Sequence, residues 1–182
     1  MTDRLGEFLH DGDRLGLRYE RQLRQPPEVV WRAITESDQL AHWLPCDIVG
    51  ERRAGADVTL EFWPSHVERY QIPRNQIRLP GEIRVWDPPR VFEWMWDVDV
   101  LRFELSPVPS GTRLVFTTWI GESDDHDYPP ASTAAGYHIC LEQLMELVES
   151  GGVRVPLVDR STVALEKAYE QSRHSTPESG AP

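Results

Sequence analysis

Two neighbouring residues, Tyr137 and His138, carry the side chains best suited to proton chemistry within an otherwise apolar helical pattern. An imidazole titrates near neutral pH, and either side chain can hydrogen-bond a carbonyl or hydroxyl of a bound molecule or move a proton. A buried histidine is more often satisfied by a neighbouring side chain of its own protein. The pair is therefore a candidate for orienting a ligand, with a purely structural role as the alternative.

The remaining titratable groups do not form a recognisable metal or redox site. His42 and His66 have no acidic residue or cysteine at metal-ligand spacing, so both are expected at the surface or at a helix edge. The acidic stretch 122–127 lacks the glycine-centred spacing of a calcium loop and is interpreted as a solvated loop. Cys46 and Cys140 lie far apart in the chain, which favours two reduced thiols over a zinc site. No metal and no other cofactor is predicted.

Composition and missing motifs exclude several function classes. The sequence contains no GxSxG, no P-loop and no GxGxxG, so serine-hydrolase and nucleotide chemistry have no support. Nineteen Lys and Arg against thirty Asp and Glu give a net charge of −11, which disfavours nucleic acid and anionic membranes as partners. No stretch approaches the ~20 apolar residues of a membrane span, and the N-terminal residues do not read as a secretory signal. A cytoplasmic location is expected.

The segment 81–96, GEIRVWDPPRVFEWMW, predicts two aromatic-rich strands folded back around the corner Asp87-Pro88-Pro89. Ile83 and Val85 alternate with Glu82, Arg84 and Trp86, and Phe92, Trp94 and Trp96 share one face of the second strand. Large aromatic side chains do not easily interdigitate to full density. A sheet face crowded with them can therefore leave a cavity for an apolar ligand.

The rest of the chain predicts further antiparallel strands and a long helix. A helix is expected over 27–35 after two prolines, and a second short one over 38–43 with Ser37 as its N-cap. Apolar residues from Ala134 to Val148 recur at helical spacing and predict a long helix that ends at Gly151-Gly152. The irregular segment 63–80 is not assigned to a helix or a strand, although Val67 to Ile72 could form a strand. Strands are expected at 14–24, 48–53, 58–63, 81–86, 91–96, 101–105 and 112–120.

This order of elements predicts an α+β fold. A curved antiparallel sheet with one apolar face needs a cover, and a single long amphipathic helix laid in its concavity provides one. Such a two-layer arrangement leaves space between the helix and the sheet. The sequence therefore predicts a two-layer α+β architecture, with two short helices directly after the first strand.

Four segments in this order, PPEVVWRAITESDQLAHWLP, GEIRVWDPPRVFEWMW, GTRLVFTTW and AGYHICLEQLMEL, resemble the polyketide-cyclase/START-like (SRPBCC) superfamily with the birch-pollen-allergen helix-grip fold. Within it they are most similar to small prokaryotic proteins that resemble the C-terminal domain of the heat-shock-protein-90 ATPase activator. The resemblance spans roughly Leu15 to Glu149. It implies a helix-grip domain, which we place at 1–152. The residues that follow predict an extension over 153–182, with one short helix over 161–172 and a polar, proline-containing tail from Arg173 onward that is expected to be disordered.

The family resemblance implies an internal cavity between the long helix and the sheet, used across the superfamily for lipids, sterols, polyketides and other apolar molecules. It implies no general reaction for the prokaryotic proteins. Three features depart from the family pattern: Tyr137 stands where a Trp is usual, the segment 63–80 is longer, and the tail after Gly152 is extra.

Side-chain direction along the expected strands and helices predicts which residues line that cavity. They are the inward-facing aromatic and apolar residues of the sheet, of the two short helices and of the long helix. The predicted ligand contacts are Trp31, Trp43, Phe62, Phe92, Trp94, Trp96, Phe103, Phe116, Thr118, Tyr137, His138, Leu141 and Met145. Each of these residues could also be ordinary core.

Three functions are open at this point. The first is non-catalytic binding of an apolar small molecule such as a lipid, a polyketide or an aromatic metabolite. The second is an aromatase or cyclase enzyme in which Tyr137 or His138 moves protons; the sequence does not decide whether a reaction is catalysed. The third is a chaperone-related interaction module, or a homodimer, that uses the C-terminal extension around Leu165 and Tyr169.

Overall fold

The computed structural model describes residues 5–121 and 129–175. Most of the acidic loop predicted at 121–130 lies outside the described residues. The tail was predicted to be disordered from Arg173 onward, which was wrong for residues 173–175, because they form the end of a helix; the rest of the tail lies outside the described residues. Within the described part, eight strands form one antiparallel sheet in the order β1-β2-β8-β7-β6-β5-β4-β3. The strands are β1 (Glu7–Asp11), β2 (Arg14–Leu23), β3 (Cys46–Gly50), β4 (Ala56–Phe62), β5 (Arg78–Asp87), β6 (Val91–Trp96), β7 (Asp99–Val108) and β8 (Gly111–Trp119).

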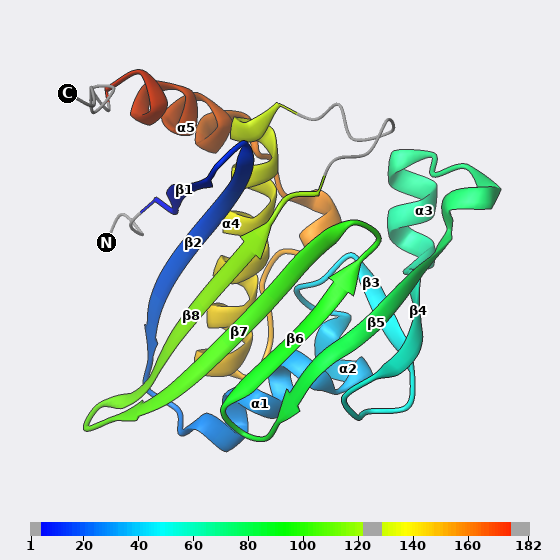
Figure 1. Cartoon of the computed structure of the whole chain (residues 1–182), viewed down its shortest axis with the longest axis vertical. Helices are drawn as coiled ribbons and strands as arrows, with labels where there is room; N and C mark the ends of the chain where they lie inside the picture. Colours follow the sequence, from blue (N-terminus) through cyan, green and yellow to red (C-terminus); the bar gives the residue numbers. More distant parts are fainter. Residues whose placement is uncertain (1–4, 122–128, 176–182) are drawn as a thin grey trace.

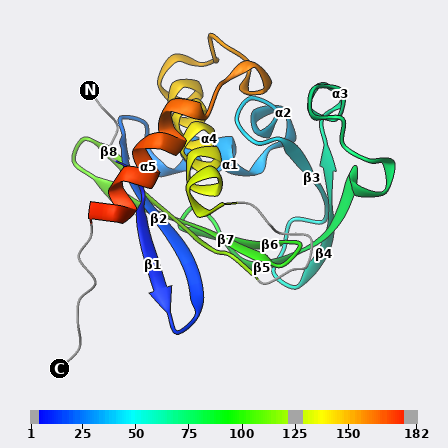
Figure 2. The same ribbon diagram turned by 90° about the horizontal axis from the view of Figure 1, so that it is seen from above.

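The helices lie on one side of the curved sheet. They are α1 (Pro27–Thr35), α2 (Ser37–Leu40), α3 (Pro64–Tyr70), α4 (Pro130–Ser150) and α5 (Val163–Ser175). Seen from above, α4 runs along the concave face, α5 lies beside it over β1 and β2, and α3 projects at the opposite edge near β4 (Figure 2). Figure 1 shows α1 and α2 at the end of the sheet away from the tip of α5. The α+β helix-grip fold expected from the sequence is confirmed.

Helix α4 follows from its sequence pattern. Pro130 occupies the first turn, where its missing N–H costs nothing, and Gly151 ends the helix in the left-handed region at φ 74°. Its buried face includes Leu141, Leu144 and Val148, which confirms the predicted helical spacing. The predicted end at Gly151 is also confirmed.

The short helices after the first strand are confirmed, but their caps are not. Helix α1 has the predicted bounds, and α2 ends at Leu40, three residues earlier than expected. The prediction that Ser37 is an N-cap was wrong, because Glu36 precedes the helix and makes no side-chain capping bond. Backbone N–H groups of Gln39 and Leu40 bond the carbonyl of Glu36 instead.

The aromatic hairpin is confirmed, with β5 paired to β6 across the proline corner. The expected alternation along β5 breaks, because the register shifts between Ile83 and Val85. A bulge inserts one residue, so Trp86 turns to the same side as Ile83. There Trp86 packs on the ring of Trp31 from α1 at 5.1 Å, whereas the sequence pattern had placed it on the opposite face.

The segment 63–80 differs most from expectation. The suggestion of a strand over 67–72 was wrong: residues Pro64–Tyr70 form α3, with Pro64 in its first turn and Gln71 in the left-handed region at φ 52°. Strand β5 begins at Arg78, three residues before the predicted start. Strand β1 at the sheet edge was not predicted, since none of its residues is buried and its pattern is irregular.

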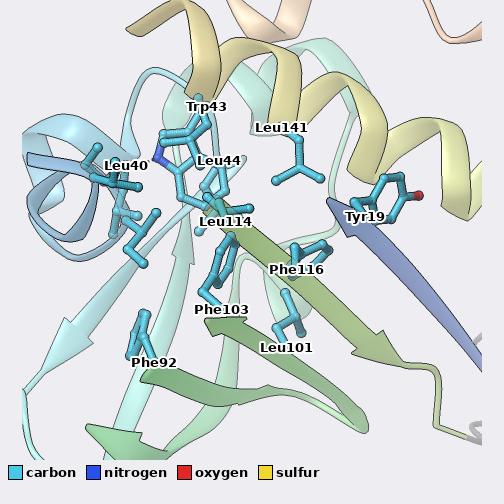
Figure 3. Packing of buried hydrophobic residues seen from close by; sticks show 14 of the residues in the cluster. Tyr19, Leu40, Trp43, Leu44, Phe92, Leu101, Phe103, Leu114, Phe116 and Leu141 are labelled. Carbon is cyan, nitrogen blue, oxygen red and sulfur yellow. Dashed lines mark hydrogen bonds between the residues drawn. The ribbon is translucent and has the colours of Figure 1, made fainter. Parts of the chain in front are cut away.

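The middle of the space between α4 and the sheet is densely packed (Figure 3). Aromatic rings from neighbouring strands form a continuous row: the ring centroids of Phe92 and Trp94 are 4.7 Å apart, those of Trp94 and Phe103 5.6 Å, and those of Phe103 and Phe116 4.6 Å. All four residues are at most 1% exposed. A void of about 10 Å³ remains beside Leu141 of α4, no more than room for one water molecule.

Candidate ligand-binding pocket

A pocket of about 680 Å³ opens at one end of the interior, beneath the N-terminal half of α4. This volume falls within the ~300–1,000 Å³ that is usual for small-molecule sites. Exposed residues such as Tyr70 and Gln76 form part of its wall, so the pocket reaches the surface. The lining residues are Leu44, Pro45, Phe62, His66, Tyr70, Ile72, Pro73, Gln76, Leu79, Trp96, Asp97, Asp99, Ile120, Ser132, Thr133, Gly136, Tyr137, Ile139, Cys140, Leu157, Arg160 and Thr162.

Two segments that lie far apart in the sequence build much of this wall. The stretch 66–76 contributes α3 and the loop after it, and the stretch 157–162 contributes the turn between α4 and α5. These two segments touch each other, since α3 contacts the 3-10 turn Leu157–Asp159. The segment 66–76 and the C-terminal extension therefore shape the same pocket.

Helix α4 presents a small-residue surface to the pocket. Ser132, Gly136 and Cys140, spaced by four residues, lie on the lining face. A Cβ atom built on Gly136 would meet no heavy atom within 4 Å. Glycine in a helix interior is less favourable than alanine by about 0.5–1 kcal/mol. Gly136 thus enlarges the pocket at a cost in helix stability.

Tyr137 is the polar side chain at the inner end of the pocket. Its ring packs against the ring of Phe116, with the two centroids 5.3 Å apart. Burial, with a further contribution from Asp99, raises the pKa of Tyr137, so the phenol stays protonated. Asp99 is 6% exposed, and its Oδ1 accepts a hydrogen bond from the N–H of Gly121 at 2.8 Å.

His66 corrects a sequence-based expectation. The sequence placed it at the surface or a helix edge, but the side chain is 4% exposed and forms part of the pocket wall. Burial lowers its pKa, so the ring is neutral at neutral pH. Its Nδ1 lies 3.5 Å from the Ser65 hydroxyl, and its Nε2 has no hydrogen-bond partner in the described part of the chain.

A series of hydrogen bonds and ion pairs between side chains fixes the C-terminal extension to α4. The Nη2 atom of Arg160 donates to Glu142 Oε2 at 2.5 Å, and Glu142 Oε1 lies 3.5 Å from His138 Nε2. His138 Nδ1 is 2.7 Å from the hydroxyl of Tyr169, which also accepts a hydrogen bond from the N–H of Gly6 at 2.8 Å. The hydrogen bond to His138, together with Arg160, lowers the pKa of Glu142. Both ring nitrogens of His138 are therefore engaged within the protein.

The structure separates the predicted ligand contacts into three groups. Phe62, Trp96 and Tyr137 line the large pocket. Tyr137 also borders the small void, together with Trp43, Phe103, Phe116 and Leu141. Trp31, Phe92, Trp94, Thr118, His138 and Met145 line neither space, and their role as ligand contacts stays a prediction.

Most pocket residues were missed by sequence reasoning. Those of α3 and the following loop could have been suggested by Pro64, which is typical of a first helical turn. Gly136 within a long helical pattern was a second usable signal, since a glycine there often has a packing or functional reason. Nothing in the sequence indicated that Leu157, Arg160 and Thr162 fold back over the pocket, because that depends on the docking of α5.

The described residues restrict other kinds of site. Within 5–121 and 129–175, no group of three or more His, Cys, Asp and Glu gathers to hold a metal ion. No helix in the same ranges is both long and apolar enough to cross a membrane. Cys46 is buried and Cys140 half-buried, and both are free thiols, as the sequence predicted. Burial raises the pKa of the Cys140 thiol to about 12, which makes it a weak nucleophile.

Known structures share this fold at low sequence identity. A conserved protein of unknown function, EF2215 from Enterococcus faecalis, aligns with a TM-score of 0.72 and 20% identity over 93% of this chain and 90% of its own. CalU16 from Micromonospora echinospora aligns with a TM-score of 0.63 and 17% identity over 93% and 95%. The Aha1 dimer from Colwellia psychrerythraea gives a TM-score of 0.55 and 19% identity over 75% and 97%.

The family assignment comes from the sequence. No match is found among curated proteins. Residues 24–149, which include α1, the sheet from β3 to β8 and nearly all of α4, match the family described as Activator of Hsp90 ATPase homolog 1-like protein. The match covers well over half of the chain and agrees with the helix-grip architecture. The chain belongs to this family of Activator of Hsp90 ATPase homolog 1-like proteins, within the SRPBCC superfamily.

Proposed function

We propose that this protein binds an apolar small molecule, without converting it, in the pocket beneath the N-terminal half of α4. The observation that supports this most is the pocket itself, about 680 Å³ in volume and lined by Phe62, Trp96, Leu79 and Ile139 among others. Ligand sites of this kind combine an apolar wall with a few polar groups that fix orientation. The fold supports the same proposal, because the helix-grip architecture holds a helix over a concave sheet.

Apolar burial alone would give modest affinity. A ligand that removes about 200 Å² of apolar surface from water gains roughly 5 kcal/mol. Part of that gain is lost to the restricted motion of the bound molecule. Tight binding therefore requires polar contacts as well, and Tyr137, His66 and Asp97 are available in the pocket wall for that purpose.

The interior geometry offers less support to the other two functions. Of the two proton-transfer candidates, Tyr137 lies in the pocket wall while His138 has both ring nitrogens engaged elsewhere. In the C-terminal extension, Tyr169 is fully buried and Leu165 packs against the core, so neither presents a free surface to a partner. Pairing with a second copy or another protein through the extension stays a prediction.

The direct test is a thermal-shift screen of apolar compounds against the wild-type protein and a variant whose pocket is filled. Gly136→Trp places a large side chain into the open space on α4. We expect compounds that raise the melting temperature of the wild type to lose that effect in Gly136→Trp. Ala164→Trp, on the exposed side of α5, is the matched control and should respond as the wild type does.

Binding in the pocket can also be measured by how far it protects the Cys140 thiol from chemical modification. Cys140 lines the pocket, whereas Cys46 is 0% exposed. Cys140 is a weak nucleophile, so the reagent must be in large excess and the reaction must be followed slowly. A bound compound should slow the modification of Cys140 by a small alkylating reagent further, measured by peptide mass spectrometry, with Cys46 as the internal reference. Gly136→Leu replaces Gly136→Trp if the larger variant does not fold. The proposal is wrong if no apolar compound stabilises the protein, or if the compounds that do act equally on the filled variants.

A further inference from the structure

We infer, on the basis of the binding function proposed above, that the ligand of this pocket is a cation: a ring-containing apolar body that carries a protonated amine. Four features of the pocket wall lead to this class of ligand. They are its charges, its aromatic rings, a buried ring nitrogen of His66 that has no partner in the described residues, and the poor environment it offers to a carboxylate.

The charged residues of the wall leave it negative. Asp97 contributes a carboxylate, whereas the Asp99 carboxylate already accepts a hydrogen bond from the N–H of Gly121, and Arg160 is the one arginine or lysine among the described lining residues. The guanidinium of Arg160 is already paired with the Glu142 carboxylate at 2.5 Å. His66 contributes no positive charge at neutral pH because burial lowers its pKa. A positive group on the ligand would balance the remaining charge.

Aromatic rings surround the same space. Phe62 and Trp96 pack edge to face with centroids 5.9 Å apart, and Tyr70 and Tyr137 add two further rings to the wall. The faces of aromatic rings attract ammonium and guanidinium groups, and the attraction is stronger where water is excluded. The rings also accommodate the apolar body of the ligand. Carboxylate and aromatic groups on one wall are the combination that recognises an organic ammonium.

His66 supplies a buried ring nitrogen without a partner in the described residues. Its Nδ1 faces the Ser65 hydroxyl at 3.5 Å, and its buried Nε2 makes no hydrogen bond within residues 5–121 and 129–175. Buried polar atoms are normally satisfied, by protein, water or ligand. In the tautomer that carries its proton on Nδ1, the Ser65 hydroxyl can accept from Nδ1 and Nε2 is left as an acceptor. An ammonium has N–H donors and no acceptor, so it matches that nitrogen and the carboxylate of Asp97.

A carboxylate ligand, such as a fatty acid, fits poorly. It would be buried beside Asp97 and Asp99, and a like charge at short range disfavours the ionised form. Its best partner, Arg160, would first have to leave Glu142, whose own carboxylate would then lose its ion pair.

The experiment compares three probes with one aromatic body: naphthylmethylamine, naphthylmethanol and naphthoate, titrated calorimetrically into the full chain at neutral pH. We expect the amine to bind about tenfold more tightly than the alcohol, and the acid to bind more weakly than either. Asp97→Asn should remove most of the preference for the amine. Asparagine is well tolerated at this residue's positive φ of 53°, so the variant preserves the turn.

Asp57→Asn is the matched control, because it removes one negative charge from an exposed position outside the pocket wall. It should keep the preference for the amine. The inference is overturned if the three probes bind equally, if naphthoate binds more tightly than the amine, or if the amine does not bind. It is also overturned if Asp97→Asn leaves the preference for the amine intact. If naphthylmethanol or naphthoate binds without a preference for the amine, and Gly136→Trp abolishes that binding, the proposed function stands and only this inference fails. If neither these probes nor the apolar library binds, the proposed function and the inference both fail.

Discussion

Helix α4 covers two regions of the sheet that differ in packing. Beneath its middle, Phe103 and Phe116 pack in a row that leaves a void of about 10 Å³. Beneath its N-terminal half lies a pocket of about 680 Å³. The comparison shows that many aromatic residues do not by themselves create a cavity. Rings on adjacent strands stack against one another, whereas the pocket forms where α4 carries small residues and the segments 66–76 and 157–162 extend the wall.

The largest effect on stability is expected when one aromatic ring is truncated in each region. Phe103→Ala should lower the free energy of unfolding by about 3–5 kcal/mol, because the fully buried ring leaves a cavity in a packed row. Phe62→Ala, at the half-buried pocket wall, should cost clearly less. Chemical denaturation of both variants measures the two losses. Equal losses would mean that the two regions are packed alike.

A smaller effect is expected from the hydroxyl that ties the extension to α4. Tyr169→Phe removes the partner of both His138 Nδ1 and the Gly6 N–H, and should cost about 1–3 kcal/mol because buried groups are left unsatisfied. Tyr70→Phe is the control, since Tyr70 is 58% exposed, and should change stability by less than about 0.5 kcal/mol. Denaturation gives both values. Limited proteolysis should also show faster cleavage after residue 152 in Tyr169→Phe, and unchanged cleavage would contradict the role of this bond in holding the pocket wall.

The smallest expected effect has the opposite sign. Gly136→Ala should raise the free energy of unfolding by about 0.5–1 kcal/mol, because alanine favours the helix and its Cβ meets open space. Two residues earlier, Ala134 is 0% exposed, so Ala134→Leu should cost about 1–3 kcal/mol through overpacking. Thermal or chemical unfolding of the two variants compares the pocket with the core on one helix. A loss of stability in Gly136→Ala would show that the space beside it is not free.

The fold was largely predictable from sequence because its signals are local and mutually consistent. The spacing from Ala134 to Val148 predicted α4, and the alternation of Leu101, Phe103 and Leu105 predicted the inward face of β7. The bulge between Ile83 and Val85 was not predictable in this way. It depends on pairing with β6, and no single-strand pattern contains that information.

The pocket was much less predictable. Phe62, Trp96 and Tyr137 were identified because their direction follows from the periodicity of their own elements. His66 was placed at the surface because its helix was not recognised. Arg160 and Thr162 could not be assigned at all, since their position depends on contacts with residues far away in the sequence.

The amino-acid sequence by itself determined the order of strands and helices, the inward face of most strands and the family of the chain, because periodicity and turn residues act over short distances. Only the tertiary structure decided where the space between α4 and the sheet is filled and where it is open. Whether an aromatic side chain packs against a neighbour or faces empty space depends on what the opposite element places there, as Gly136 and the row beginning at Phe92 show.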